Sequence, residues 1–400
     1  MNAMKKILKS ITLLTLGVLM SVGMQSCLDD GNETIALEKA RNHTGIPDDS
    51  EAGESPVITD GSTTTIPNVS YSTEIVNGDV VVRLDMTGVR DAETLEWLRL
   101  FGTRQQHQNI WVEVDGKPKG FTVYNNADDE KEDAISTDIV FLVDNSGSMS
   151  EEANAIARDI VDWVQKLVAS NLDVCFGCVG YDVYGNINGA IDITDSESII
   201  DFFDYSSGTD RTVHFEGPNA STLRSAASTY TRISDECGGK ALRFADDQFH
   251  FRTRANRVYV NFTDEPNQPN YVEGYSTEYF KDQANWPSTK GTVHTVFSSD
   301  TTWVVNNEVM SYRERPWRIS WYTGGTTFFT SSSFTGVDLE SLPVTGAMQN
   351  SYVIRFTNVD DLMDGQPHEV KITVLSEDGK TRAVRIFYIV FGEPEDTDSE

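Results

Sequence analysis

The stretch "DIVFLVDNSGSMSEE", residues 138–152, joins a continuous apolar run to a loop of alternating polar side chains. An apolar run of this kind is typical of a strand that is buried on both faces of a sheet. Asp144, Ser146 and Ser148 stand at every second position directly after it. Two interpretations remain open from these residues: three oxygens directed at one metal ion, or a helix N-terminus capped by Ser148 or Ser150.

Strands and helical patterns alternate after this stretch. The segment that follows it has apolar residues at three- and four-residue spacing, as an amphipathic helix does. Further apolar runs have the length of buried strands, and they are "LDVCFGCVGY" (172–181), "RVYVNFT" (257–263) and "GTVHTVF" (291–297). Strands interleaved with helices predict an α/β fold, a doubly wound and mostly parallel sheet, over residues 135–350. Ligand sites in such sheets lie beyond the carboxyl ends of the strands.

The segments on either side of this region indicate antiparallel strands. Residues 68–130 alternate apolar and polar side chains and contain a hairpin signal at Asp115-Gly116. Residues 351–392 alternate in the same way around a turn at Asp378-Gly379. Neither segment has many strands by itself, so we expect the two β-rich flanks to pair into one β-sandwich, with the α/β domain inserted between them.

The N-terminus has the three-part layout of a secretory signal over residues 1–27. Two lysines precede an apolar stretch that is short for a membrane span, and Cys27 stands at the expected cleavage point. This resembles a bacterial lipobox, which implies that Cys27 is lipidated. Asp29 and Asp30 look like the acidic signals that send some lipoproteins to the cell surface. We therefore expect an outer membrane lipoprotein, exposed on the cell surface and attached to the membrane only through its lipid anchor.

Composition narrows the classes of function. With 62 Asp and Glu against 32 Lys and Arg, the net charge is −30, which disfavours binding to nucleic acid or to anionic membrane surfaces. Residues 28–67 are polar and acidic with no apolar period, which predicts a disordered tether, and residues 393–400 form an acidic tail. The remaining cysteines, Cys175, Cys178 and Cys237, are expected to be buried, and a disulfide between Cys178 and Cys237 stays open.

The loop after residue 143 matches D-x-S-x-S at Asp144, Ser146 and Ser148, and "RVYVNFTDEPN" (257–267) is an apolar strand that ends in Thr-Asp. Together these motifs resemble the von Willebrand factor type A domain with its metal ion-dependent adhesion site, over about residues 135–350. The resemblance implies that Asp264 supplies the distal carboxylate.

The resemblance leaves two candidates for the remaining ligand. Glu236 precedes Gly-Gly and a helical pattern in "SDECGGKALRFADDQF", which is similar to the integrin β I-like variant of the family. Thr209 in "SSGTD" is the alternative, but a long polar insertion, residues 206–235, separates it from the next strand. We favour Glu236, and we expect the insertion to contribute to the choice of partner.

Carboxylate and hydroxyl oxygens without His or Cys suit Mg²⁺, or Ca²⁺ or Mn²⁺. By resemblance, such an ion accepts an Asp or Glu of a protein partner, so the main hypothesis is metal-dependent adhesion without enzymatic activity. Two other hypotheses stay open: a structural or assembly subunit of a surface filament in which the metal is structural, and a metal-assisted hydrolase, for which the sequence offers no evident general base.

Overall fold

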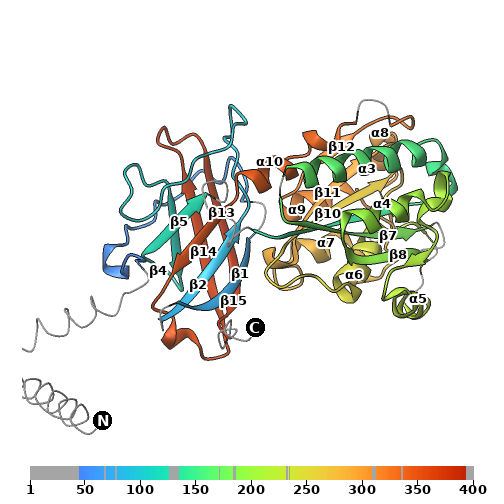
Figure 1. Cartoon of the computed structure of the whole chain (residues 1–400). Coiled ribbons are helices and arrows are strands. Elements are labelled where there is room, and N and C mark those ends of the chain that lie inside the picture. The colour runs from blue at the N-terminus through green and yellow to red at the C-terminus, as the bar shows by residue number, and fades with distance from the viewer. Residues whose placement is uncertain are drawn as a thin grey trace, which may run out of the picture. The chain divides into compact units, whose positions relative to one another are not determined.

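The computed structural model describes residues 45–66, 69–76, 79–125, 135–170, 172–182, 186–230, 233, 235–308, 312–334 and 337–392. They form a β-sandwich and an α/β domain, each around its own hydrophobic core (Figure 1). No helix in these ranges is long and apolar enough to cross a membrane. The predicted signal peptide with Cys27, the first part of the tether and the acidic tail lie outside the described residues.

The α/β domain is built on a seven-stranded sheet with the order β12-β11-β10-β6-β7-β8-β9. Neighbouring strands run parallel, apart from the antiparallel pair β7 and β8. The strands are β6 (Thr137–Asp144), β7 (Val174–Tyr181), β8 (Ile187–Thr194), β9 (Phe215–Glu216), β10 (Asn256–Thr263), β11 (Thr292–Phe297) and β12 (Thr327–Phe329). This confirms the predicted doubly wound, mostly parallel sheet, and its strand order is consistent with a type A-like fold.

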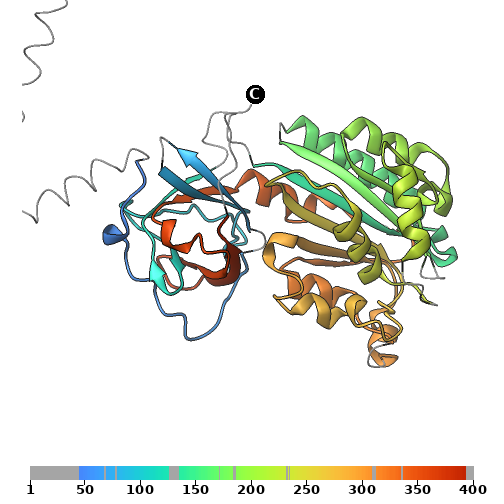
Figure 2. The same ribbon diagram turned by 90° about the horizontal axis from the view of Figure 1, so that it is seen from below.

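Helices cover both faces of this sheet (Figure 2). One face packs against α3 (Ala153–Ala169), α4 (Ser196–Asp204) and α10 (Val344–Gln349). The other packs against α5 (Ala220–Thr229), α6 (Gly238–Gln248), α7 (Thr277–Lys281) and α9 (Trp317–Thr323). Helix α3 buries Ile156, Ile160, Val164 and Leu167, because three- and four-residue spacing places them on one side of the helix.

Shorter helices lie in the connections. They are α8 (Thr301–Asn306) and the 3₁₀ helices η1 (Asp49–Glu51), η3 (Gly147–Ser150), η4 (Gly208–Thr212), η5 (Glu273–Tyr275), η6 (Ser288–Lys290), η7 (Leu339–Ser341) and η8 (Asp360–Leu362). The insertion at residues 206–235 is therefore structured in its described part, since it contains η4, β9 and α5.

Each of the two sheets of the β-sandwich contains strands from both flanks. One sheet has the order β1-β2-β13-β5 and the other β15-β14-β3-β4. The strands are β1 (Val69–Val76), β2 (Asp79–Met86), β3 (Ile110–Val114), β4 (Lys117–Pro118), β5 (Phe121–Asn125), β13 (Tyr352–Phe356), β14 (Pro367–Leu375) and β15 (Arg382–Val390). C-terminal β13 lies between β2 and β5, and β14 pairs with β3. The α/β domain is thus inserted between the two halves of one sandwich.

The predicted tether extends too far. Residues 45–66 are ordered, although the sequence predicted a disordered segment up to residue 67. Asp49 accepts hydrogen bonds from Lys119 Nζ (2.7 Å) and Gly120 N (3.0 Å), and Thr63 N donates to the Arg382 carbonyl (2.8 Å). This segment forms no regular strand, so its sequence has no apolar period. Polar contacts with the sandwich hold it in place, and a sequence pattern does not reveal such contacts.

His368 provides a test of the sandwich. Its Nδ1 lies 2.7 Å from Asp115 Oδ2 and its Nε2 lies 3.1 Å from Asp364 Oδ1, and these hydrogen bonds, the first above all, raise the pKa of His368 above 6.5. A raised pKa in the folded state stabilises the fold below pH 6.5 and loses that effect as the pH rises through the folded value. We expect His368→Gln to lower the urea midpoint at about pH 5.5 and to change it much less at about pH 9. An equal loss at both pH values would contradict this assignment.

Candidate metal centre

The loops after β6 and β10 lie at one edge of the α/β sheet. Because the two strands are parallel neighbours, with Val143 opposite Phe262, their carboxyl ends meet. Asp144 is the last residue of β6, and Asp264 follows the last residue of β10. Glu236 lies two residues before α6, whose N-terminus is directed to the same edge.

Hydrogen bonds connect the side chains of the first loop to Asp264. Asp144 is buried, and its Oδ1 accepts from Ser146 N (3.0 Å). Ser146 Oγ lies 3.0 Å from Ser148 Oγ, and Ser148 Oγ donates to Asp264 Oδ1 at 3.1 Å. Helix α3 starts later, and its N-cap residue, Glu152, makes no side-chain cap. The interpretation of Ser148 or Ser150 as the helix cap was therefore wrong.

The structure places Glu236 in this group and does not place Thr209 there. Glu236 is 6% exposed, and its carboxyl group lies close enough to Asp144 and Ser146 for both to affect its pKa. Thr209 lies on η4 and lines a small cavity beside Asp144, and among the described residues it makes no hydrogen bond to the acidic side chains. Glu236 therefore lies among the predicted side chains, and its preference over Thr209 as a metal ligand stays a prediction.

Two further acids surround the predicted residues. Glu152 is fully buried and accepts from Ser298 Oγ (3.0 Å), and Glu265 follows Asp264 directly. Neither residue is among the predicted metal ligands. The Thr-Asp-Glu run at the end of the strand was a signal for Glu265, whereas Glu152 turns inward only because α3 packs on the sheet.

Burial raises the pKa of all these carboxyl groups. Desolvation, with Asp264 as a nearby like charge, raises the pKa of Asp144 to about 7. Desolvation and the charge of Asp144 raise the pKa of Glu236 to about 8. The pKa values of Asp264, Glu152 and Glu265 are raised by burial as well. No Lys, Arg or His in the described ranges forms an ion pair within 4.0 Å of any of the five.

This donor set fits a hard divalent cation. The charge of Arg313 acts on Glu265, but Asp144, Glu236 and Asp264 have no counter-ion among the described residues, and two hydroxyl oxygens lie among them. In the described part of the chain no group of three or more His, Cys, Asp or Glu side chains is placed to hold a metal by itself. Any metal here would therefore depend on the hydroxyls of Ser146 and Ser148 in addition to the carboxylates, and thiolate or imidazole ligands are not part of the set.

A buried network positions the loop that carries Glu236. Asn267 Oδ1 accepts from Gly239 N (2.9 Å) and from Cys237 Sγ (3.2 Å), and Asn267 Nδ2 donates to Glu314 Oε2 (3.0 Å). A side chain at Gly239 would put its Cβ 2.3 Å from the Tyr275 carbonyl oxygen, so only glycine fits there. Cys237 is a free thiol, as are Cys175 and Cys178, so the disulfide left open above is absent.

The roles of Glu236 and Thr209 can be separated by substitution. We expect Glu236→Gln to weaken Mg²⁺ binding about tenfold or more, because the charge of the ligand set determines affinity for a hard cation. Thr209→Val should leave the affinity unchanged. The measurement is the Mg²⁺ concentration that gives half of the maximal rise in unfolding temperature. If Thr209→Val weakened Mg²⁺ binding and Glu236→Gln did not, Thr209 would be the ligand in place of Glu236.

No family model matches the sequence, and no curated protein matches it. Solved structures with similarity include an aerotolerance-related membrane protein from Bacteroides fragilis, with 16% identity over 53% of this chain and 98% of that chain and a TM-score of 0.32. BatB from Bacteroides thetaiotaomicron has 15% identity over 53% and 97%, with a TM-score of 0.32. The manganese-loaded TRAP protein of Plasmodium vivax has 12% identity over 69% and 98%, with a TM-score of 0.31. At these values no function is carried over.

Proposed function

We propose that this protein is an adhesion protein of the bacterial surface that binds a protein partner through a divalent cation. The cation would be held at the edge where β6 and β10 end, by Asp144, Ser146, Ser148, Glu236 and Asp264. The partner would supply an Asp or Glu side chain. The observation that supports this proposal is the group of buried carboxylates without a counter-ion among the described residues, joined to two serine hydroxyls.

Each residue has a distinct part in this proposal. Asp144 and Asp264 compensate the charge of the cation from two strand ends. Ser146 and Ser148 contribute neutral oxygens, which leave the ion electrophilic. Glu236 adds a third negative charge, which strengthens cation binding and weakens attraction for an incoming carboxylate. A bound Mg²⁺, Ca²⁺ or Mn²⁺ would supply a coordination position open to a carboxylate oxygen of the partner.

The surface beside this group has the composition of a protein-binding site. The Arg313 guanidinium carbon lies 5.5 Å from the ring centroids of both Trp303 and Tyr312, and Tyr312 Oη donates to Asp235, the neighbour of Glu236. Tyr271, 72% exposed, lies 6.5 Å from Tyr312 between ring centroids. Tyr, Trp and Arg carry much of the binding energy in protein interfaces. This observation favours a protein partner. It also indicates that the loops around residues 271 and 312, in addition to the insertion at residues 206–235, contribute to the choice of partner.

The test is capture of partners with and without the cation. The purified protein is immobilised and incubated with extracts of host or neighbouring bacterial cells, in Mg²⁺ or in EDTA, and bound proteins are quantified by mass spectrometry. We expect a set of proteins that is captured in Mg²⁺ and lost both in EDTA and with Asp144→Ala. Capture that is the same in all three conditions would rule out the metal-bridged mechanism.

A matched control separates the metal site from general stability. Asp195 caps α4, where its side chain accepts from Ser198 N (2.8 Å), and it follows Thr194, which pairs with Phe176 near the start of β7. It therefore lies at the opposite edge of the sheet. Asp195→Asn should change stability little, because asparagine caps a helix about as well as aspartate, and it should keep the Mg²⁺-dependent capture.

The proposed activity is binding and not catalysis. The proposed attachment to the cell surface is through Cys27. Among the described residues no histidine contacts the acidic group, so a general base other than its own carboxylates is not evident. Lipid attachment would show as a mass increase on the N-terminal peptide. Loss of that increase and of outer membrane fractionation in Cys27→Ser would support the anchor.

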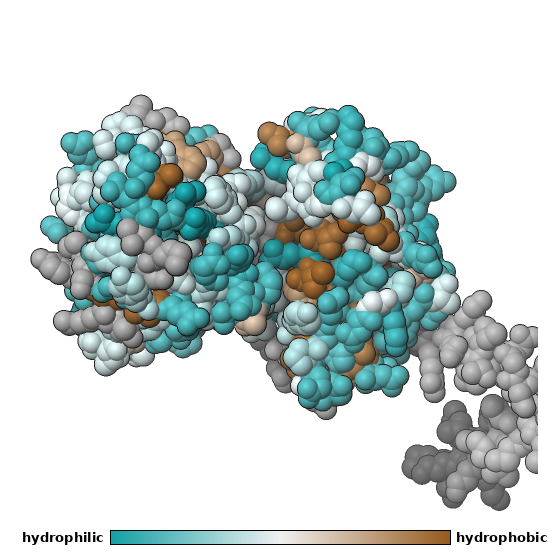
Figure 3. All heavy atoms as spheres, turned by 180° about the vertical axis from the view of Figure 1, so that it is seen from behind, coloured by the Kyte–Doolittle hydropathy of each residue, from teal (hydrophilic) through white to brown (hydrophobic). Residues whose placement is uncertain are grey.

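A second candidate function is assembly, and strand β15 favours it. The N–H and the carbonyl of Arg382 both bond to Thr63, so they point away from β14. Peptide groups alternate in direction along an antiparallel strand, so those of every second residue after Arg382 also point away from β14. Ile386, Tyr388 and Val390 thus have peptide groups on an open sheet edge, and their side chains are 41–51% exposed. Apolar residues gather on one face of the sandwich (Figure 3). The arginines of β15 lie in its first half, and the part from Ile386 to Val390 is apolar without lysine or proline; such an open edge is a template for a further strand.

In this second candidate function the partner is a second copy of this chain. Two β15 strands can pair about a two-fold axis at Tyr388, which places apolar residues opposite each other. Sedimentation velocity should show concentration-dependent dimers that Tyr388→Lys abolishes. Trp321→Lys is the matched control, since Trp321 is similarly exposed on α9 of the other domain. A wild-type protein that stays monomeric at all concentrations contradicts assembly through β15.

A further inference from the structure

A cavity of about 250 Å³ lies at the edge of the α/β sheet opposite to the candidate metal centre. Val258 and His294 line it near the starts of β10 and β11, and Val344 and Met348 line it from α10. Arg90 and Trp97, from the connection after β2, close the side that faces the sandwich. It shares no residue with the acidic group, so its function is a separate question.

His294 presents a hydrogen-bond donor to this cavity. The side chain is 4% exposed, its Nδ1 lies 2.9 Å from Thr326 Oγ1, and the same Nδ1 accepts from Thr326 N at 3.2 Å. Nδ1 therefore carries no hydrogen in the neutral ring, and Nε2 carries it. Burial lowers the pKa of His294 to about 4, so the ring is neutral near pH 7. In the described part of the chain no hydrogen bond of the Nε2–H is found, so this donor is available to a ligand in the cavity.

Arg90 presents an uncompensated positive charge. Its guanidinium carbon lies 5.0 Å from the Trp97 ring centroid, and its Nε is buried without a hydrogen-bond partner. Among the described residues it forms no ion pair. The chain therefore holds this guanidinium against an aromatic ring and leaves its donors for another acceptor.

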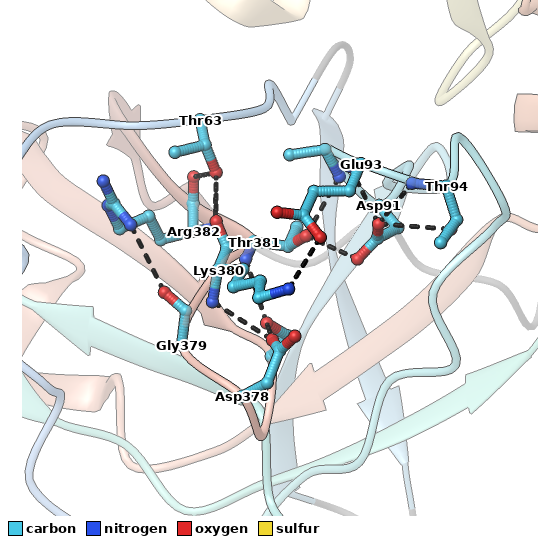
Figure 4. A network of polar contacts seen from close by, with 11 residues as sticks. Thr63, Asp91, Glu93, Thr94, Asp378, Gly379, Lys380, Thr381 and Arg382 are labelled. Carbon is cyan, nitrogen blue, oxygen red and sulfur yellow. Dashed lines mark hydrogen bonds and ion pairs between the residues drawn. The ribbon is translucent and has the colours of Figure 1, made fainter.

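The adjacent Asp91 does not neutralise Arg90, because other groups use its oxygens (Figure 4). Thr381 Oγ1 donates to Asp91 Oδ2 at 2.5 Å, and Asp91 Oδ1 accepts from Glu93 N (2.9 Å), Thr94 N (2.8 Å) and Thr94 Oγ1 (3.1 Å). These bonds fix the turn after Arg90. They direct the carboxylate toward the β14–β15 connection, and they hold this wall of the cavity in place.

From these contacts we infer that the cavity binds a small monocarboxylate with an apolar body. The carboxylate would accept from Arg90 and from His294 Nε2, and the body would pack against Val258, Val344 and Met348. Charge-assisted hydrogen bonds of this kind are stronger than neutral ones. The volume is below the roughly 300 Å³ at which sites for drug-sized ligands begin, so the ligand should have on the order of ten non-hydrogen atoms.

The test uses benzoate as the probe and benzamide as its uncharged match. Both are titrated into the purified protein with ¹⁵N-labelled histidine, and the His294 ring signals are followed; His294→Gln identifies them among the six histidines. We expect saturable shifts of His294 with benzoate and affinity for benzamide lower by about tenfold or more.

Two variants and one control complete the experiment. Arg90→Met keeps an unbranched stem over Trp97 and should weaken benzoate binding about tenfold or more, whereas Arg104→Met, at an exposed arginine that pairs with Glu51, should bind as the wild type does. Ala347→Leu should fill the cavity and abolish binding of both probes. Equal affinity for benzoate and benzamide, an unaffected Arg90→Met variant, or a cavity that holds only water and gives no shift with either probe would each overturn the inference.

Discussion

Asp144→Asn is expected to abolish the rise in unfolding temperature that Mg²⁺ gives the wild-type protein. A cation that binds only the folded state stabilises it by about 2.7 kcal/mol at a concentration 100 times its dissociation constant. Asp144 is almost fully buried, and among the five acids it is the one that connects both strand ends, through Ser146 N and Thr263 Oγ1 (2.8 Å). Its removal should therefore cost most of this effect.

The same variant has a second expected result that distinguishes a lost site from a damaged fold. In EDTA, Asp144→Asn should unfold at the wild-type temperature or above it, because it removes a buried charge that has no counter-ion among the described residues. The measurement is differential scanning calorimetry with Mg²⁺ and with EDTA. Equal Mg²⁺-induced rises in the variant and the wild type would show that Asp144 is not a ligand, and Asp195→Asn provides the control that keeps the rise.

Removal of residues 351–392 is expected to unfold the β-sandwich. It deletes β13 from between β2 and β5 and deletes β14, the partner of β3. Ile354, Ile372 and Phe387 are buried residues of the shared core that would be lost with these strands. The remaining N-terminal strands cannot close two sheets, so the effect should be complete loss of the sandwich and not a partial weakening.

Limited proteolysis and far-ultraviolet circular dichroism of the truncated chain give the measurement. We expect rapid cleavage within residues 69–125 and protection of the α/β domain. A chain that ends at Gly392 is the matched control, because it keeps every described strand and should resist cleavage in the sandwich. Protection of residues 69–125 in the truncated chain would show that the N-terminal flank folds independently.

The α/β fold was predictable because its information is local. Strands that are buried on both faces must be continuously apolar, as residues 139–143 are, and the helices between them must have apolar residues at three- and four-residue spacing. The Asp115-Gly116 turn between β3 and β4 was predictable for the same reason, since both residues have positive φ there. The order of residues 45–66 was not predictable, because it results from single polar contacts with distant strands.

The acidic group combines both kinds of information. Asp144, Ser146 and Ser148 form a local motif, and Asp264 follows from the rule that parallel strands end at one edge of the sheet. Glu152 has no such signal, because a glutamate at a helix start is ordinarily solvated; it is buried here by the packing of α3. The position of Glu236 beside Asp144 depends on where the loop before α6 lies, and the Asn267 network holds that loop.

By itself the sequence determined the periodicities, and with them the sheet, its helices and the strand end that carries D-x-S-x-S, because these depend on residues close in the chain. Only the tertiary structure decided which side chains lack a partner. The charges of the acidic group, and the donors of Arg90 and His294 in the cavity, are unpaired because of what packs around them, and that depends on contacts between residues far apart in the sequence.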